Sequence, residues 1–274
     1  MSISPTYGMI IPGEDEATIN FTLSLDNDVA EALNCGREVL EDIIILRLEN
    51  GRDYYITVTG KYARSCFGMS VDELVLYSDP IRSVPLDPIE RAKKYGSNQT
   101  AVICVPKELW RMVDAIYEKG LHTKGLFQTP GYSEEMYQIR ECLDSGAPFG
   151  EFRIFSMAEV LTAFLTTLSA TIVPPNLNLA QEIDSNNLQN TARKMLEDLP
   201  PIHYNVFVYM ISFFREYLKQ QNNGLQTATA AAARICCDCL VLGSKGQMDD
   251  NANSAQRRKA VSMMMFYFLD TNSI

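Results

Sequence analysis

Apolar and polar residues alternate near the start of the chain. In residues 17–25, ATINFTLSL, each large apolar side chain is followed by Asn, Thr or Ser, the pattern of a strand with one buried face. Two more apolar segments, at 41–48 and 53–62, flank the sequence ENGR at 49–52. Its Asn-Gly pair favours a type I′ hairpin turn, because both residues tolerate positive φ. Residues 1–62 therefore predict a β-sandwich or part of one.

The composition changes after this region. Residues 80–100 contain three prolines and many polar side chains, which predicts a linker with one short helical piece. We therefore expect a partial β domain at 1–78, a linker at 79–101 and an all-α domain at 102–274.

Beyond the linker, apolar residues recur with the period of an α-helix. Residues 105–120, VPKELWRMVDAIYEKG, carry an apolar stripe, with Pro106 suited to the first turn and Gly120 to the end. The next strong pattern opens with Ser156 and Glu159, which predicts a capping box. Further helices are expected at about 186–199, 203–220, 226–242 and 254–270.

Composition and charge narrow the class of protein. The 274 residues are 46% hydrophobic and 21% charged, as in a folded chain with room for two domains. The net charge is −10, of which residues 1–50 contribute −8 with ten acidic and two basic residues. Without a basic patch, nucleic acid is not an expected partner.

The chain also shows no targeting or membrane signal. No apolar run approaches the roughly 20 residues that span a membrane, and the first residues lack the pattern of a signal peptide. We therefore expect a cytoplasmic protein that reaches membranes only through protein partners.

Neither a metal nor a cofactor is expected. The seven cysteines are an odd number, and three of them lie in ICCDCL at 235–240 without a nearby His, which favours reduced thiols buried on a helix over a zinc site. The glycine patterns of the P-loop and of dinucleotide-binding folds are missing as well.

Three aromatic residues are candidate contact sites. Tyr55 lies on the more polar side of its predicted strand, and Trp110 and Tyr117 share a side of their helix away from the apolar stripe. Tyr and Trp are common in binding hot spots. The alternative is that each packs beneath a loop.

Several segments resemble one protein family. GREVLEDIIILRLENGRDYYITVTGKYARSCFG (36–68) is similar to the end of the ASH domain of OCRL-type (Lowe syndrome) inositol polyphosphate 5-phosphatases. VPKELWRMVDAIYEKG, GLFQTPGYSEEM (125–136) and LPPIHYNVFVYMISFFREYLK (199–219) resemble the RhoGAP-like domain that follows it. The resemblance implies a partial Ig-like sandwich followed by an all-α RhoGAP-like domain.

The resemblance also implies what this chain lacks. The family's phosphatase domain and its first ASH strands have no counterpart here, so phosphoinositide hydrolysis is not expected. We expect a fragment of a longer chain; the alternative is that another chain covers the exposed strand edge.

Gln128 is the most informative departure from active relatives. Active RhoGAP domains resemble GIFR at this loop, and their arginine accelerates GTP hydrolysis by about 10³ to 10⁵. Here Gln128 takes that place, and the family's supporting lysine and asparagine align with Thr162 and Ala231. The resemblance therefore implies a non-catalytic RhoGAP fold.

The resemblance further implies partners. It assigns Tyr55 to the binding of GTP-loaded Rab proteins, and Trp110 with Tyr117 to helical F&H peptides of endocytic adaptors, with Rac and Cdc42 as further candidates. Location at endosomal or Golgi membranes through these partners is expected. Two alternatives stay open: a weak genuine Rho-family GTPase-activating protein in which Gln128 orients water, and a dimerisation role for the acidic β part.

Overall fold

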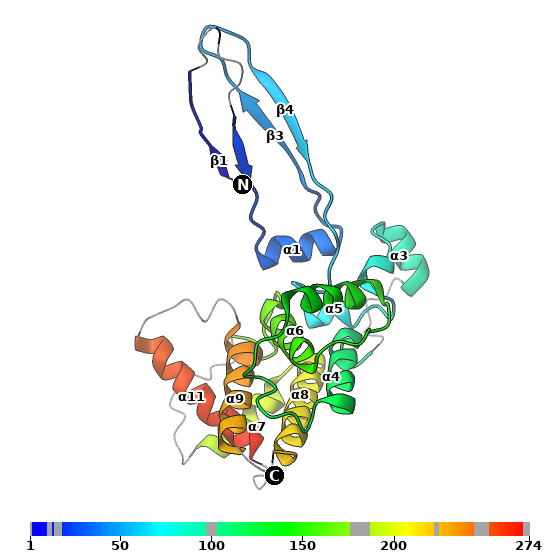
Figure 1. The fold of residues 1–274 in the computed structure, drawn as a ribbon, viewed down its shortest axis with the longest axis vertical. Coiled ribbons are helices and arrows are strands. Elements are labelled where there is room, and N and C mark those ends of the chain that lie inside the picture. Colours follow the sequence, from blue (N-terminus) through cyan, green and yellow to red (C-terminus); the bar gives the residue numbers. More distant parts are fainter. Residues whose placement is uncertain are drawn as a thin grey trace.

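The computed structural model describes residues 2–9, 13, 18–96, 103–175, 187–221, 225–243 and 252–270. A β region at the N-terminus extends away from a domain of packed helices (Figure 1). The predicted fold class, a small β region followed by a helical domain, is confirmed.

The β region consists of two antiparallel ribbons. Strand β1 (Ser2–Ser4) pairs with β2 (Asn20–Thr22), and β3 (Glu41–Leu46) pairs with β4 (Tyr54–Thr59). Between β2 and β3 lies helix α1 (Asn27–Asn34), in a stretch where the sequence pattern predicted only β structure. The helix begins there because the Asp26 carboxylate caps it, accepting a hydrogen bond from the Val29 N–H at 2.9 Å.

The predicted hairpin is present, but its predicted turn type is wrong. Leu46 lies opposite Tyr54, so the connection runs from 47 to 53 and is longer than a two-residue turn. Asn50 has a φ of 60°, whereas Gly51 does not have positive φ. A type I′ turn needs positive φ at both residues.

The β3–β4 ribbon has no packed face among the described residues. Ile43 on one face is 56% exposed and Ile56 on the other is 45% exposed. The two described sheets each have two strands, so the predicted sandwich core is not formed by these residues. A two-stranded ribbon gains little stability without such a core.

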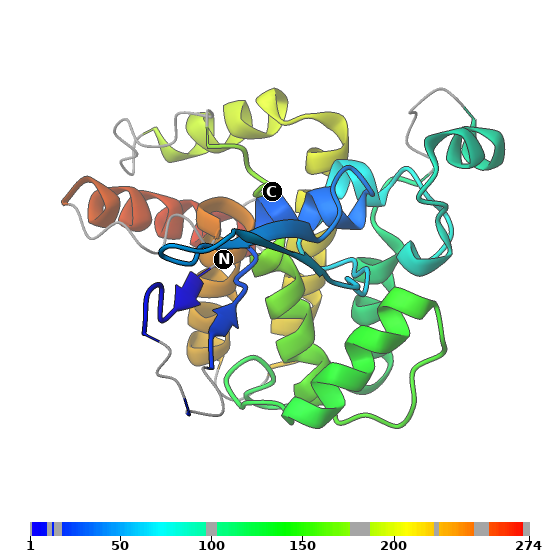
Figure 2. The same cartoon turned by 90° about the horizontal axis from the view of Figure 1, so that it is seen from above.

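The helical domain is built from elements that differ widely in length. Figure 2 shows α5 and α7 at opposite edges of it. The elements are α2 (Val71–Leu74), η1 (Ile81–Ser83), α3 (Pro88–Tyr95), α4 (Lys107–Lys119), α5 (Ser133–Ser145), α6 (Ile154–Thr167), α7 (Leu188–Asp198), α8 (Pro201–Lys219), α9 (Leu225–Ile235), the π-helix η2 (Cys236–Leu242) and α11 (Ala252–Leu269).

The apolar stripes predicted from the sequence form one continuous core. On α4, the buried residues include Leu109, Met112 and Ile116, each 0% exposed, and this helix packs against α6. Helix α4 begins after Pro106 and ends at Gly120, as predicted. The core is therefore assembled from helical faces that sequence periodicity identifies well.

Helix α9 continues into η2 without a break. The segment Leu225–Leu242 has a mean hydropathy of 1.3 over 18 residues, and half of it is buried in the molecule. By length and composition it could cross a membrane, but its contacts with α6, α8 and α11 are those of a core helix. The three clustered cysteines lie here, buried as predicted, and burial raises the pKa of the Cys239 thiol to about 11.

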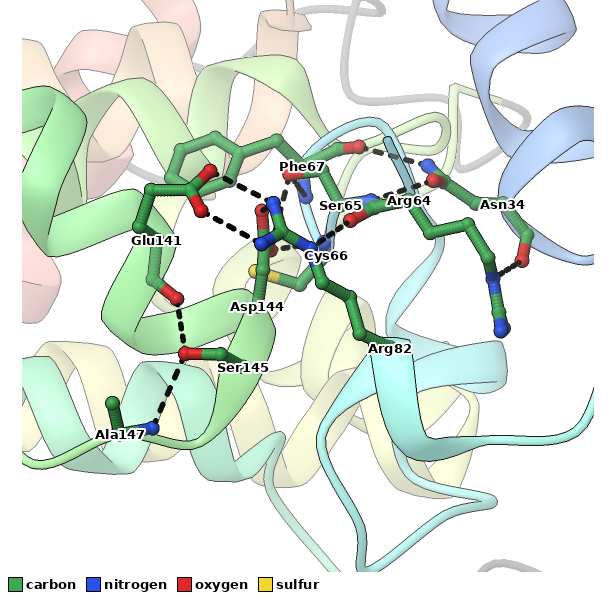
Figure 3. Close-up of polar contacts among 10 residues, drawn as sticks. All are labelled: Asn34, Arg64, Ser65, Cys66, Phe67, Arg82, Glu141, Asp144, Ser145 and Ala147. Carbon is green, nitrogen blue, oxygen red and sulfur yellow. Dashed lines mark hydrogen bonds and ion pairs between the residues drawn. The ribbon is translucent and has the colours of Figure 1, made fainter. Parts of the chain in front are cut away.

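A polar junction attaches the end of the β region to the helical domain (Figure 3). The carboxylate of Asp144, at the end of α5, is 2% exposed. Its Oδ1 accepts hydrogen bonds from the Cys66 N–H at 2.8 Å and the Ser65 hydroxyl at 3.1 Å. The guanidinium of Arg82 lies 3.6 Å from its Oδ2 and binds Glu141 through two hydrogen bonds of 2.7 and 2.8 Å.

The same junction reaches back to α1. The Asn34 side chain accepts a hydrogen bond from the Ser65 N–H at 2.8 Å and donates one to the Phe67 carbonyl at 3.2 Å. The Arg64 side chain donates to the Asn34 carbonyl at 2.8 Å. Segment 64–67 is thus held by α1 on one side and by α5 on the other.

The domain boundary near residue 78 stays a prediction. Residues on both sides of it share one core, because Met69, Leu74 and Ile81 are buried in the same cluster as the residues of α4 and α6. The predicted short helix of the linker is confirmed as α3.

Candidate functional site

The site is a pocket of about 390 Å³ between one loop and two helices. The loop follows α4, and the helices are α6 and α9. The pocket is lined by Leu126, Phe127, Gln128, Thr129, Pro130, Ala158, Glu159, Thr162, Ala231, Arg234 and Ile235.

The pocket brings together three positions that the sequence singled out. Gln128, Thr162 and Ala231 come from the loop, α6 and α9, and all three line the pocket. They are far apart in the sequence, so only the fold makes them neighbours. Their functional roles stay predictions.

The loop is fastened to the core by an apolar anchor. Leu126 is 1% exposed, and the ring of Phe127 contacts three aromatic rings of α8. The centroids of Phe127 and Tyr217 are 5.3 Å apart, with an edge-to-face geometry that aromatic pairs prefer. The buried Leu126 and the partly buried Phe127 fix the direction in which the exposed Gln128 leaves the core.

A polar clamp holds the other end of the loop. The Glu159 carboxylate accepts a hydrogen bond from the Gly131 N–H, and the Ser156 hydroxyl accepts one from the Tyr132 N–H at 3.1 Å. The predicted capping box of Ser156 and Glu159 is therefore wrong, since α6 begins earlier, at Ile154. Their side chains bind this loop instead of the end of their own helix.

The three predicted positions offer little charge to the pocket. The side-chain amide of Gln128 donates a hydrogen bond to the Thr227 carbonyl at 3.2 Å. The Thr162 hydroxyl donates to the Ala158 carbonyl at 3.0 Å, within its own helix, and Ala231 has no polar side chain. None of them presents a cation.

Two charged residues of the lining were not predicted as site residues from the sequence. Glu159 is one, and its carboxylate is engaged by the clamp. Arg234 is the other, with a side chain that is 84% exposed. The only sequence signal was its spacing of three residues from Ala231, which places both on one side of α9.

Comparison with protein families identifies two parts of the chain. The model of the ASH domain of OCRL-like inositol polyphosphate 5-phosphatases matches residues 1–62, and the RhoGAP domain model matches residues 106–235. The chain combines an OCRL-like ASH segment with a RhoGAP domain. The pocket lies within the RhoGAP domain.

Individual relatives agree with this assignment. The type II inositol 1,4,5-trisphosphate 5-phosphatase of Mus musculus is 33% identical over 233 residues, covering 81% of this chain and 23% of the relative. Rho GTPase-activating protein 25 of Mus musculus is 24% identical over 169 residues, covering 58% of this chain and 23% of that relative. The chain thus spans less than a quarter of the length of either.

A solved structure supports the fold of the RhoGAP domain. The crystal structure of human Rho GTPase-activating protein 15 matches with a TM-score of 0.51 at 12% sequence identity. The match covers 70% of this chain and 89% of that structure. At this identity the likeness concerns the fold alone.

The aromatic pair on α4 of the RhoGAP domain is exposed. Trp110 is 52% exposed and Tyr117 is 48% exposed, so neither is a core residue. Tyr209 of α8 lies near this surface: its pKa is raised to about 12 by burial and by the nearby Asp114 and Tyr117. The surface therefore combines aromatic side chains with the carboxylate of Asp114.

Tyr55 of the ASH segment is also exposed. It is 69% exposed and lies opposite Ile45 on β3. Ile43 lies on the same face, because residues two apart on a strand point the same way. Thr57 and Thr59 lie on this face as well, so it is the more polar face of the ribbon, as predicted, and the two isoleucines of β3 add apolar surface beside Tyr55.

We predict that Gly131→Ala disturbs the pocket loop. A Cβ at this position would lie 2.6 Å from the Ser156 Cα, which is backbone and cannot move aside cheaply. The expected loss is about 1–3 kcal/mol of unfolding free energy, measured by urea denaturation. Gly150→Ala is the matched control, because its nearest contact would be an ordinary 3.5 Å to the Phe152 ring. Equal stability of the two variants would contradict the tight fit of the loop against α6.

Proposed function

We propose that this chain is a non-catalytic binding module for small GTPases and adaptor peptides, of the kind found in OCRL-like inositol polyphosphate 5-phosphatases. The observation that carries the proposal is the pocket, which lies in the RhoGAP domain and to which Gln128, Thr162 and Ala231 present no cation. The module would act in signal transduction and endosomal membrane trafficking. The protein would be cytoplasmic and would bind endosomal or Golgi membranes peripherally, through its partners.

The absence of an arginine at position 128 has a large expected effect on the rate of GTP hydrolysis. An arginine finger lowers the barrier to GTP hydrolysis by about 4 to 7 kcal/mol. A neutral amide forms weaker hydrogen bonds than a guanidinium. One N–H of the Gln128 amide also donates to the Thr227 carbonyl, so moving the side chain away from α9 toward a nucleotide would cost that bond.

The rival function is a weak genuine GTPase-activating protein in which Gln128 orients the attacking water. Its support is chemical, since some GTPases use a glutamine in this way. The hydrogen bond to Thr227 counts against it, because it draws the amide toward α9. A binding role needs no such rearrangement.

We predict that Ala231→Glu weakens the binding of GTP-loaded Rac and Cdc42. The added carboxylate would occupy the pocket and repel the phosphates of a docked GTPase, weakening binding by about tenfold or more, or about 1.4 kcal/mol. Titration calorimetry with each GTPase would measure this.

The control variant is Ala230→Glu. Ala230 is exposed and adjacent in sequence, but it does not line the pocket, so the same charge is added to the same helix. Equal weakening by both variants would contradict docking at the pocket. Absence of binding by the wild type to any Rho-family or Rab GTPase would contradict the proposed function itself.

Adaptor peptides are assigned to the exposed surface of α4. Helix-in-groove recognition uses apolar anchors, which Trp110 and Tyr117 can supply. We predict that Trp110→Ala reduces F&H-peptide affinity at least tenfold while the thermal midpoint changes little, because the side chain is half exposed. Tyr137→Ala, at a 62% exposed position on α5, is the control. A large loss of thermal stability in Trp110→Ala would instead make Trp110 a packing residue.

GTP-loaded Rab proteins are assigned to the face of the ASH segment that carries Tyr55. We predict that Tyr55→Ala weakens Rab binding by about 1 to 2 kcal/mol, because an exposed aromatic residue beside Ile43 and Ile45 is a typical contact anchor. Tyr54→Ala tests the opposite face of the same strand and should leave binding nearly unchanged. Equal affinities of the wild type and Tyr55→Ala would remove this face from the Rab site.

A further inference from the structure

Arg234 gives the pocket a cationic group. Gln128, Thr162 and Ala231, which were compared with active RhoGAP domains, supply none. Among the residues that line the pocket, Arg234 is the cation and Glu159 is the anion. The Glu159 carboxylate already accepts the Gly131 N–H. The pocket therefore offers an incoming anion one guanidinium and no other charged donor.

The guanidinium of Arg234 is weakly held. Its Nε lies 3.8 Å from Oδ2 of Asp238, four residues along the helix. Asp238 makes the shorter contact with Arg258, at 2.9 Å between Nη1 and Oδ1. An exposed ion pair of this length contributes little, so Arg234 can leave Asp238 at small energetic cost.

The pocket wall beside Arg234 is open. Ala231 lies one turn earlier on α9 and has only a methyl group, and Thr162 across the pocket is short, with its hydroxyl turned to the Ala158 carbonyl. A long side chain at either position would occupy the space that a guanidinium needs to turn inward. The small side chains leave that space to Arg234 or to a ligand.

We propose that Arg234 binds the terminal phosphate of the nucleotide in a docked small GTPase and so makes docking depend on the nucleotide state. This rests on the proposed function, in which the GTPase docks at the pocket. A guanidinium provides up to five N–H donors in a planar fork that suits phosphate oxygens. Arg234 would make this contact with bound GTP before hydrolysis. An interaction that is equally strong in the ground state and the transition state raises the affinity for the GTPase without raising the rate of hydrolysis.

The test compares affinities for two nucleotide states. A GTPase that binds the wild type is loaded with a non-hydrolysable GTP analogue or with GDP, and titration calorimetry is run with the wild type, Arg234→Ala and Arg234→Lys. We expect Arg234→Ala to weaken binding of the GTP-analogue form about tenfold or more and of the GDP form less than threefold. Arg234→Lys should restore part of the difference, because it keeps the charge and loses the fork.

Arg193→Ala is the matched control. Arg193 lies on α7 with a side chain that is 81% exposed, and it is also paired with the acidic residue four positions later, Glu197, at 3.0 Å. Arg193→Ala should change neither the affinity for the GTP-analogue form nor the affinity for the GDP form. The thermal midpoints of all variants should stay close to that of the wild type, because both arginines are exposed.

Three outcomes would overturn the inference. An equal loss for both nucleotide states would show that Arg234 contacts a carboxylate of the GTPase and not the terminal phosphate. Unchanged affinities would show that Arg234 lies outside the docked surface, while the proposed function would stand because the wild type binds. Failure of the wild type to bind any GTPase would remove both proposals together.

Discussion

The buried carboxylate of Asp144 is the interaction on which the arrangement of the two parts depends. It accepts hydrogen bonds from the Cys66 N–H and the Ser65 hydroxyl and lies beside Arg82. Burial raises its pKa, and the hydrogen bonds from Cys66 and Ser65 act in the opposite direction. Loss of this carboxylate would leave the buried Cys66 N–H without a partner, a penalty of about 1 to 3 kcal/mol. Because segment 64–67 also binds α1, the junction fixes how the ASH segment leaves the RhoGAP domain.

A second constraint acts on the pocket loop. Leu126 and Phe127 are anchored in the core, and Gly131 is bound to Glu159. The loop therefore keeps a defined shape around the exposed Gln128, the residue that the resemblance places where active RhoGAP domains have arginine. The clamp fixes the shape of the loop independently of the charge at Gln128, Thr162 and Ala231, which carry no cation. This separation is the physical basis for proposing a binding module and not an enzyme.

Sequence patterns predicted the helices whose stripes are longest and most regular, such as α4 and α8, because core burial imposes the helical period on them. The sequence patterns gave wrong predictions where contacts between distant segments determine the partner of a side chain. Ser156 and Glu159 match a capping box locally, but the loop before α5 competes for their side chains. Helix α1 was missed because the strand pattern of the preceding residues was extended past its Asp26 cap. The resemblance to RhoGAP domains identified Gln128, Thr162 and Ala231, whereas Arg234 became a candidate only when the fold placed it in the same pocket.

The most direct measurement of the central claim is single-turnover GTP hydrolysis by a panel of Rho, Rac, Cdc42 and Rab proteins, with this protein in excess. Quantifying released phosphate over time gives the rate with and without the protein, and Gln128→Arg serves as the comparison variant. If the loop keeps its shape but lacks the catalytic charge, the wild type should change the hydrolysis rate less than twofold. The Gln128→Arg variant should accelerate hydrolysis more than the wild type does, on any GTPase that docks. Acceleration of tenfold or more by the wild type would contradict the account and would make the protein a GTPase-activating protein.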